Sequence, residues 1–237
     1  MNLASDTIIA LLKHALTVSL RIMGSHERAT QLPFFSIISQ RLIENCYRRA
    51  WYSKLGAATV LKYLIETMPL SWLETNDVVI FGAFMFIIRD LFDQVSFGAV
   101  DFAKECIEKL VIKLVTESKL NPKIEMDIVK ELISASGVVR KFCQKMIRIV
   151  AHEQKCTVQD IIKRYKKVFT EQKDKIEKDK DILPITPPHG KLFHRSVPLQ
   201  IGILDGVIFC LDLKPQPLFV FEWEKSNQTH IFLQEIF

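Results

Sequence analysis

The stretch CYRRAWYSKLGAATVLKYLIETM, residues 46–68, combines features that predict two different kinds of structure. Its beginning places two arginines beside Trp51 and Tyr52, and arginine with aromatic residues is typical of surfaces that bind nucleic acid. Its middle interrupts a helical pattern with Gly56-Ala57-Ala58. Glycine costs about 1 kcal/mol relative to alanine inside a helix, so close approach of a neighbouring helix is the expected compensation. We therefore interpret the stretch as a packing joint between helices.

Composition favours a helical protein with a substantial core. Of the 237 residues, 49% are hydrophobic and 25% charged, and only 8 are glycine, which argues against a turn-rich β fold. The formal net charge of +5 is well short of that of a dedicated DNA-binding protein. Five cysteines occur without a C-x-x-C pair, and most lie on apolar faces of helical patterns. This usage predicts a reducing compartment and no disulfide framework.

Apolar residues recur at spacings of three and four along most of the chain, as in amphipathic helices. Ser5, Asn121 and Thr157 are expected N-caps, and residues 24–31 are expected to form a loop. We expect helices over residues 5–23, 33–47, 51–68, 98–117, 121–134 and 136–154, one that begins at Ser71 or Leu73 and ends at Phe92, and another beginning at Thr157.

Three of these helices carry a small residue at an equivalent position. Ala57, Ala103 and Cys143 are 46 and 40 residues apart, and HEAT repeats recur at about 40–47 residues as antiparallel helix pairs. The pattern predicts an all-α fold, an α-solenoid of HEAT-like antiparallel helix pairs, with a single irregular helical bundle as the alternative. We expect HEAT-like repeats over residues 1–182, a proline-rich connector over 183–198, and an incomplete further helical repeat segment over 199–237.

The sequence contains none of the motifs that mark common enzyme or metal sites. Phosphate-binding glycine loops, the zinc-protease motif and the nucleophile elbow are all missing. His152 with Cys156, and His189 with His194, do not make the two clean ligand pairs of a zinc site. Asp205 is interpreted as a polar group of a helix or turn. We expect no catalytic, cofactor-binding or metal-binding residues, no cofactor and no small-molecule substrate.

Two further segments could be binding surfaces, one for nucleic acid and one for a membrane. Residues 163–167 concentrate basic side chains, but between residues 155 and 181 nine Lys/Arg accompany six Asp/Glu, which favours a solvated helix face over a nucleic-acid site. The candidate contact patch consists of Lys163, Arg164, Lys166 and Lys167. The apolar run 78–88 is too short to span a membrane, so a buried helix is expected there. Neither a membrane nor direct nucleic-acid contact is expected.

The opening stretch also resembles a segment of the TRRAP family of transcription-associated adaptors, which are related to the phosphatidylinositol-3-kinase-like kinases. The family signature is matched by Cys46, Tyr47, Arg49, Trp51, Tyr52, Lys54, Leu55 and Gly56. Residues 90–111 and 200–210 resemble later parts of the same family, and the similarity covers residues 31–237.

The resemblance implies a HEAT-repeat segment of a non-catalytic scaffold in SAGA-type and NuA4/TIP60-type histone acetyltransferase complexes, located in the nucleus. The implied partners are protein subunits of those complexes and transcriptional activators. The family's pseudokinase region lies far from the matching segment, so the chain is expected to be a fragment. The alternative is an unrelated HEAT-repeat scaffold, of the transport-receptor or phosphatase-scaffold type.

Overall fold

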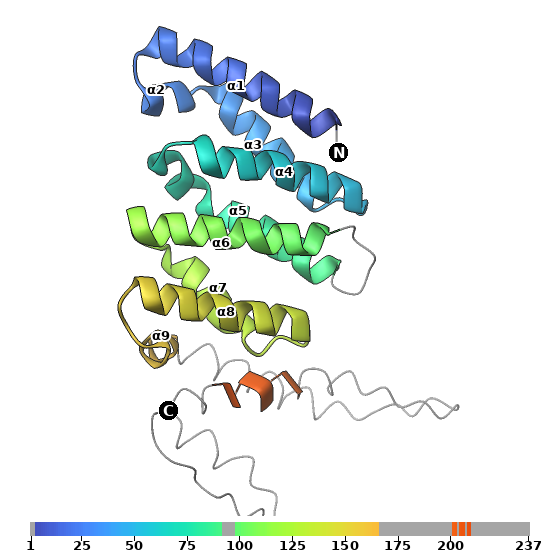
Figure 1. Ribbon diagram of the computed structural model, residues 1–237, viewed down its shortest axis with the longest axis vertical. Coiled ribbons are helices and arrows are strands. Elements are labelled where there is room, and N and C mark those ends of the chain that lie inside the picture. Colours follow the sequence, from blue (N-terminus) through green and yellow to red (C-terminus); the bar gives the residue numbers. More distant parts are fainter. Residues whose placement is uncertain (1–2, 92–97, 166–200, 203, 207, 210–237) are drawn as a thin grey trace, which may run out of the picture. The chain divides into compact units, whose positions relative to one another are not determined.

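The computed structural model describes residues 3–91, 98–165, 201–202, 204–206 and 208–209, and every element in these ranges is helical (Figure 1). The fold is all-α, as predicted, and the described positions between 201 and 209 are helical too. The helices are α1 Leu3–Met23, α2 His26–Thr30, α3 Pro33–Cys46, α4 Trp51–Thr67, α5 Leu70–Asp90, α6 Ala99–Glu117, α7 Pro122–Glu131, α8 Gly137–Glu153 and α9 Val158–Arg164.

The chain divides into two compact units, Met1–Glu125 and Met126–Phe237, with the boundary inside α7. This boundary falls within the region 1–182 that the sequence predicts to be repeats. The predicted connector 183–198 lies outside the described residues, so the domain division drawn from the sequence remains a prediction.

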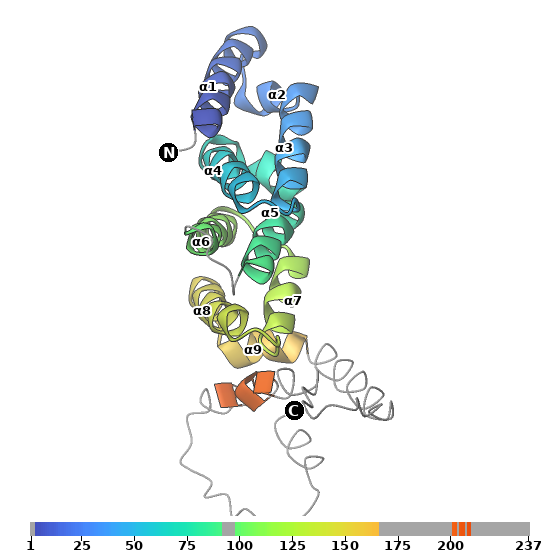
Figure 2. The ribbon, with the colours of Figure 1, turned by 90° about the vertical axis from the view of Figure 1, so that its right-hand side faces the viewer.

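In the first unit the helices form two rows (Figure 2). α1, α4 and α6 pack side by side in one row, while α3 and α5 pack together in the other. α4 and α5 are antiparallel, because Lys54 near the start of α4 meets Asp90 at the end of α5. The helix-pair architecture predicted from the spacing of small residues is thus present in this unit.

Local sequence explains where several of these helices begin. Pro33 occupies the first turn of α3, where its missing N–H costs nothing. Asn121 accepts a hydrogen bond from the Lys123 N–H at 3.0 Å, so it caps α7 as predicted. Thr157 and Asp160 form a complete capping box at the start of α9, which confirms the prediction from Thr-x-x-Asp.

Two local predictions are wrong. Residues 24–31 are not a plain loop, because the Ser25 hydroxyl accepts a hydrogen bond from the Arg28 N–H at 3.2 Å and starts the short helix α2. Ser5 does not cap the first helix, since α1 already begins at Leu3. Instead the Ser5 hydroxyl donates to the Gly56 carbonyl at 3.2 Å and links α1 to α4.

The small residues that mark the repeat are all buried. Ala57, Ala103 and Cys143 lie in the interior of α4, α6 and α8 respectively. Trp51, the first residue of α4, is only half-buried. The largest buried side chain of α4 is instead that of Lys54.

Two of the described helices, α1 and α5, are long and apolar enough to cross a membrane by length and composition alone. More than half of the apolar window of α5 is buried in the structure, as the sequence predicts for the run 78–88. The window of α1 is mostly exposed, although α1 packs against α2 and α4.

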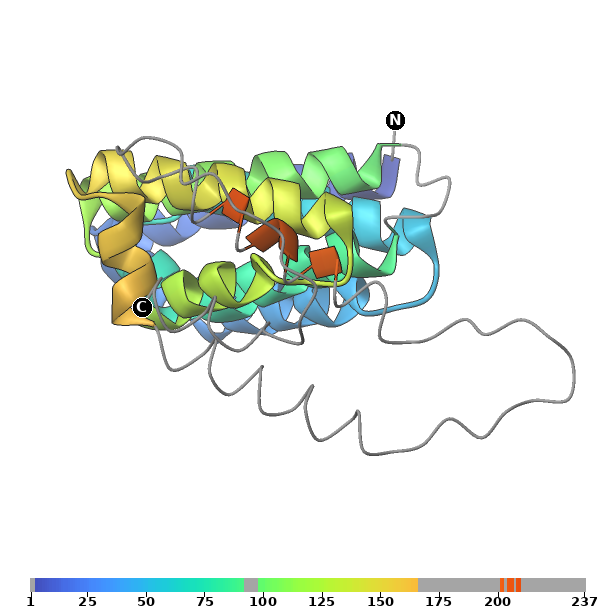
Figure 3. The ribbon, with the colours of Figure 1, turned by 90° about the horizontal axis from the view of Figure 1, so that it is seen from below.

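The second unit contains the end of α7, α8, α9 and the helical residues near position 205 (Figure 3). Seen from below, these residues lie in front of α7 and α8.

Candidate interaction scaffold

The turn between α3 and α4 separates the family signature into exposed and buried parts. Arg48, Arg49 and Tyr52 are exposed, and the Tyr52 ring stands edge-on to Trp51 with the ring centroids 5.9 Å apart. Tyr47 is partly exposed, and its ring packs on Phe86 of α5 at 4.7 Å. The opening of the signature therefore contributes side chains to the surface.

Lys54 is fully buried, which is rare for a lysine unless its charge is compensated. Its ammonium lies 2.9 Å from the Asp90 carboxylate and donates to the Arg48 backbone carbonyl. The same ammonium sits 5.1 Å from the centroid of the Phe86 ring, a cation–π contact. Lys54 therefore joins the α3–α4 turn to the C-terminal end of α5.

The buried cysteines near these contacts have thiols of low reactivity. Burial raises the pKa of the Cys46 thiol to about 12, although the nearby Lys54 charge partly opposes this shift. Burial likewise raises the pKa of Cys106 to about 12. Because the thiolate is the nucleophilic form, both side chains act as small core residues at neutral pH.

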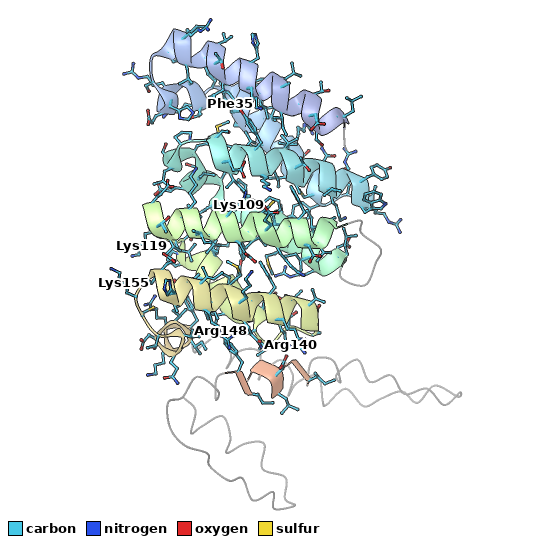
Figure 4. The ribbon with its side chains drawn as sticks, viewed as in Figure 1. Phe35, Lys109, Lys119, Arg140, Arg148 and Lys155 are labelled. Carbon is cyan, nitrogen blue, oxygen red and sulfur yellow. The ribbon has the colours of Figure 1, made fainter. Side chains whose placement is uncertain are left out.

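Polar contacts run between α4 and α6 along one side of their interface. Lys62 pairs with Glu105 at 2.8 Å, and Glu66 pairs with Lys109 at the same distance. Lys109, which Figure 4 labels on α6, also lies 3.5 Å from Glu105, and this contact links the two pairs. The Glu66 contact raises the pKa of Lys109, and the Lys62 contact lowers the pKa of Glu105, so both pairs favour the charged forms. We call these four side chains the α4–α6 ladder.

The ladder has a constant register. Its two pairs between the helices join residues 43 apart in the chain, within the spacing of HEAT repeats. Asp77 of α5 accepts a hydrogen bond from the Asn121 side chain, 44 residues later, at 3.4 Å. Burial raises the pKa of Asp77 in spite of that hydrogen bond. These polar contacts therefore join residues that lie about one repeat apart in the chain.

Sequence inspection missed both the buried lysine and the ladder. The ladder has a detectable signal, because opposite charges recur at the repeat spacing of 43 residues. Lys54 has no such signal, since a single lysine in an amphipathic helix ordinarily faces solvent.

The structure leaves the candidate basic patch partly described. Lys163 and Arg164 are exposed at the end of α9, and Arg164 donates to the Gln154 side chain at 3.1 Å. Lys166 and Lys167 lie outside the described residues. The described ranges contain no group of three His, Cys, Asp or Glu side chains placed to hold a metal ion.

Comparison with known proteins assigns the family. The model of the Tra1 HEAT repeat ring region matches residues 2–236. The chain is 34% identical over 209 residues to the transformation/transcription domain-associated proteins of zebrafish and human, a match to 82% of this chain. The chain belongs to the TRRAP/Tra1 family. It is also 26% identical over 218 residues to the yeast SAGA complex/NuA4 acetyltransferase complex subunit TRA1.

The TRRAP/Tra1 relatives are far longer than the segment they share with this chain. The match to the zebrafish and human proteins covers 82% of this chain but only 5% of each relative. The match to the yeast protein covers 86% of this chain and 5% of the relative. Membership of the family agrees with the stacked helix pairs and with the resemblance seen in residues 46–56. It also removes the alternative of an unrelated HEAT-repeat scaffold.

Proposed function

We propose that the chain is a non-catalytic scaffold segment of a co-activator histone acetyltransferase complex of the SAGA and NuA4/TIP60 type. The observation that supports this most is the family match over nearly the whole chain, together with the yeast relative's name as a subunit of both complexes. A transcription-associated adaptor acts in the nucleus, which is therefore the proposed location. Protein subunits of the complex and transcriptional activators are the proposed partners.

The architecture of the first unit suits a scaffold. Its helix pairs are held in register by buried small residues, the Lys54 contacts and the α4–α6 ladder, so the unit presents a stable surface. Exposed aromatic and arginine side chains around the α3–α4 turn are of the type that dominates protein–protein binding energy. These side chains are the first place to look for a subunit contact.

Affinity purification of the full-length gene product, followed by mass spectrometry of the recovered proteins, tests this function. Recovery of acetyltransferase-complex subunits is the expected outcome. A second purification with Arg49→Ala and Tyr52→Ala asks whether the exposed turn contributes, with Lys163→Ala and Arg164→Ala as a matched control. Recovery of transport factors alone would contradict the proposal.

We expect neither turnover nor direct nucleic-acid binding by this chain. Replacement of Lys163, Arg164, Lys166 and Lys167 by glutamine tests the basic patch. If the patch binds DNA through phosphates, the parent chain shows salt-dependent affinity and the quadruple variant shows a shallower salt dependence. We expect no salt-sensitive DNA binding by the parent chain, and reproducible catalysis by the purified chain would overturn the non-catalytic assignment.

A further inference from the structure

The exposed side of α8 carries one kind of charge. Every exposed residue of this helix is basic, and the four are Lys141, Lys145, Arg148 and His152. The sequence contains no Asp or Glu between Glu131 and Glu153. The four positions follow one another at intervals of four, three and four residues, which places them on one line along the helix. At a rise of about 1.5 Å per residue this line is roughly 16 Å long. We call these four side chains the α8 row.

The exposed side of α6 is arranged differently. It mixes acids with one cation and two uncharged residues, namely Asp101, Glu105, Glu117, Lys109, Ile112 and Thr116. Lys109 pairs with both Glu66 and Glu105, so its charge is compensated within the fold. In the part of the chain that the structure describes, no acid forms an ion pair with Lys141. The described fold therefore compensates the charge of Lys109 but not that of Lys141.

Arg140 is the one buried cation of α8, and its partners all lie inside the second unit. Its Nε donates to the Asp205 carboxylate at 2.8 Å. Its guanidinium also donates to the backbone carbonyls of Ser134 at 2.8 Å and Ala135 at 3.1 Å. Arg140 thus stabilises the turn between α7 and α8 and is not part of the exposed row.

Two contacts define the C-terminal half of the α8 row. The Arg148 guanidinium lies 5.0 Å from the centroid of the Phe209 ring, a cation–π contact that positions this side chain at the surface (Figure 4). His152 Nδ1 lies 3.0 Å from the Glu153 carboxylate, so an acid stands at the end of the row. The carboxylate of Glu153 would repel the phosphates of a nucleic acid that ran on past His152. The row therefore suits an acidic partner of limited length.

An aliphatic edge runs beside the row. Val138 and Ile149 are half-buried and lie 11 residues apart, so both stand on the same side of the four basic residues. An amphipathic helix has apolar side chains on one face and charged side chains on the adjoining face. Such a helix can pack its apolar face against Val138 and Ile149 while its acids meet the row. A nucleic-acid backbone has no apolar face to place there.

We propose that the α8 row is a docking site for an acidic, amphipathic helix of a partner protein. Acids at positions i, i+4, i+7 and i+11 of that helix face the four basic side chains. The intervals of four, three and four read the same in both directions, so a parallel and an antiparallel helix present the same pattern. The inference rests on the proposed scaffold function, because it names the chemistry of one partner surface.

The first test uses the full chain and two fluorescein-labelled helical peptides of identical composition. One peptide carries glutamates at i, i+4, i+7 and i+11, and the other carries the same glutamates distributed around the helix. We expect the first peptide to bind about fivefold more tightly at low salt and to lose this advantage in about 1 M salt, because exposed ion pairs are screened. Fluorescence anisotropy measures both affinities. Equal binding of the two peptides at low salt would overturn the inference.

The second test locates the binding surface on α8. Lys141→Gln with Lys145→Gln should weaken binding of the first peptide by about fivefold. Lys119→Gln with Lys123→Gln removes two exposed lysines around the start of α7 and is the matched control, which should bind like the parent. Circular dichroism confirms that both variants are folded. An unchanged affinity of the α8 variant, or an equal loss in the control, would show that the row is not the site. Tighter binding of a short DNA duplex than of the first peptide would also overturn the inference.

Failure of this inference is distinguishable from failure of the proposed function. The peptide measurements decide the docking site, whereas affinity purification of the full-length gene product decides the scaffold function. If the two peptides bind equally while acetyltransferase-complex subunits are still recovered, only the docking site is wrong. If transport factors alone are recovered, the scaffold function is wrong whatever the peptides do.

Discussion

At the scale of single residues, Lys54 places a charge where the α3–α4 turn, the end of α5 and the Phe86 ring meet. A buried ion pair is weak in itself, but removal of one partner leaves an uncompensated charge in the interior. The two partners of this contact are unequally buried, since the Lys54 side chain is 1% exposed and that of Asp90 is 38% exposed. Their substitutions should therefore have unequal effects.

We expect Asp90→Ala to destabilise the chain more than Lys54→Met does. The alanine variant leaves the ammonium buried with one backbone carbonyl and one ring, a loss of about 1–3 kcal/mol after allowance for the partial exposure of Asp90. The methionine variant replaces the buried cation with an apolar chain of similar length, which is often close to neutral. Urea denaturation of both variants measures the difference, with Asp101→Ala as an exposed-acid control. A larger loss for Lys54→Met would show that the charge itself stabilises this joint.

Gly56 tests the close approach of α1 to α4. The Ser5 hydroxyl contacts the Gly56 carbonyl, so a leucine side chain at this position must fit beside the α1–α4 interface. Overpacking of this kind costs about 1–3 kcal/mol. We expect Gly56→Leu to lower the thermal midpoint, and Arg48→Ala, at an exposed turn position, to leave it nearly unchanged. Equal midpoints for the two variants would contradict the interpretation of residues 46–68 as a joint.

Asp77 gives the chain a pH-dependent contribution to stability. Burial raises the pKa of this carboxyl above its ordinary value of 3.8, so the folded state disfavours the ionised form. The stability associated with the neutral acid is present below the unfolded pKa and is lost as the pH rises through the folded pKa.

Asp77→Asn should remove the loss of stability that accompanies ionisation of Asp77. Because asparagine stays neutral and its side-chain oxygen can still accept a hydrogen bond, we expect the variant to gain stability relative to the parent as the pH rises from 3 to 7, in proportion to the pKa shift (~1.4 kcal/mol per unit). Denaturant unfolding at several pH values measures this, and Asp101→Asn is the exposed control. A difference between parent and variant that does not change with pH would show that Asp77 is not the titrating group.

At the scale of elements, the α4–α6 ladder decides how one helix is placed along the next. Its pairs are partly exposed, so each contributes little to the stability of the unit, and less at high salt. Their main effect is on register. A slip of α6 by one turn would separate Glu66 from Lys109 and place like charges opposite each other.

Exchange of the two charges of one pair tests that role. Glu66→Lys alone should destabilise the first unit, because it places a third cation beside Lys62 and Lys109. Glu66→Lys combined with Lys109→Glu should recover part of the loss, which a double-mutant cycle of urea unfolding measures as a favourable coupling energy. The recovery should shrink in 1 M salt. A coupling of zero at low salt would mean that apolar packing alone sets the register.

At the scale of the whole molecule, the division into two compact units predicts that damage in one unit stays local. Repeat proteins are stabilised mainly by contacts between neighbouring helices, and they open in separate cooperative segments. We expect Asp90→Ala to speed amide hydrogen exchange in α3, α4 and α5 and to leave exchange in α8 unchanged. Hydrogen-exchange mass spectrometry of parent and variant measures this. Faster exchange in α8 as well would indicate that the two units unfold together.

Much of this organisation can be read from local patterns. The bounds of most helices follow from apolar periodicity and from caps such as Asn121 and Thr157, because these signals act within one turn of the chain. The repeat follows from the spacing of Ala57, Ala103 and Cys143, since only small side chains allow close packing at such positions. Apolar periodicity does not predict the short helix α2, because five residues are too few to show a period.

By itself, the sequence determined the all-α class and the helix pairs, because both depend on residue types at regular spacings. It also determined the family, because its residues match the family model over positions 2–236. Only the tertiary structure decided which side chains of those helices meet. Lys54 is buried because a carboxylate 36 residues later and the carbonyl of the preceding turn converge on its ammonium. Asp205 is a partner of Arg140 because two glycines allow its helix to approach the α7–α8 turn. Contacts between residues so far apart in the chain depend on packing geometry, which local spacing does not encode.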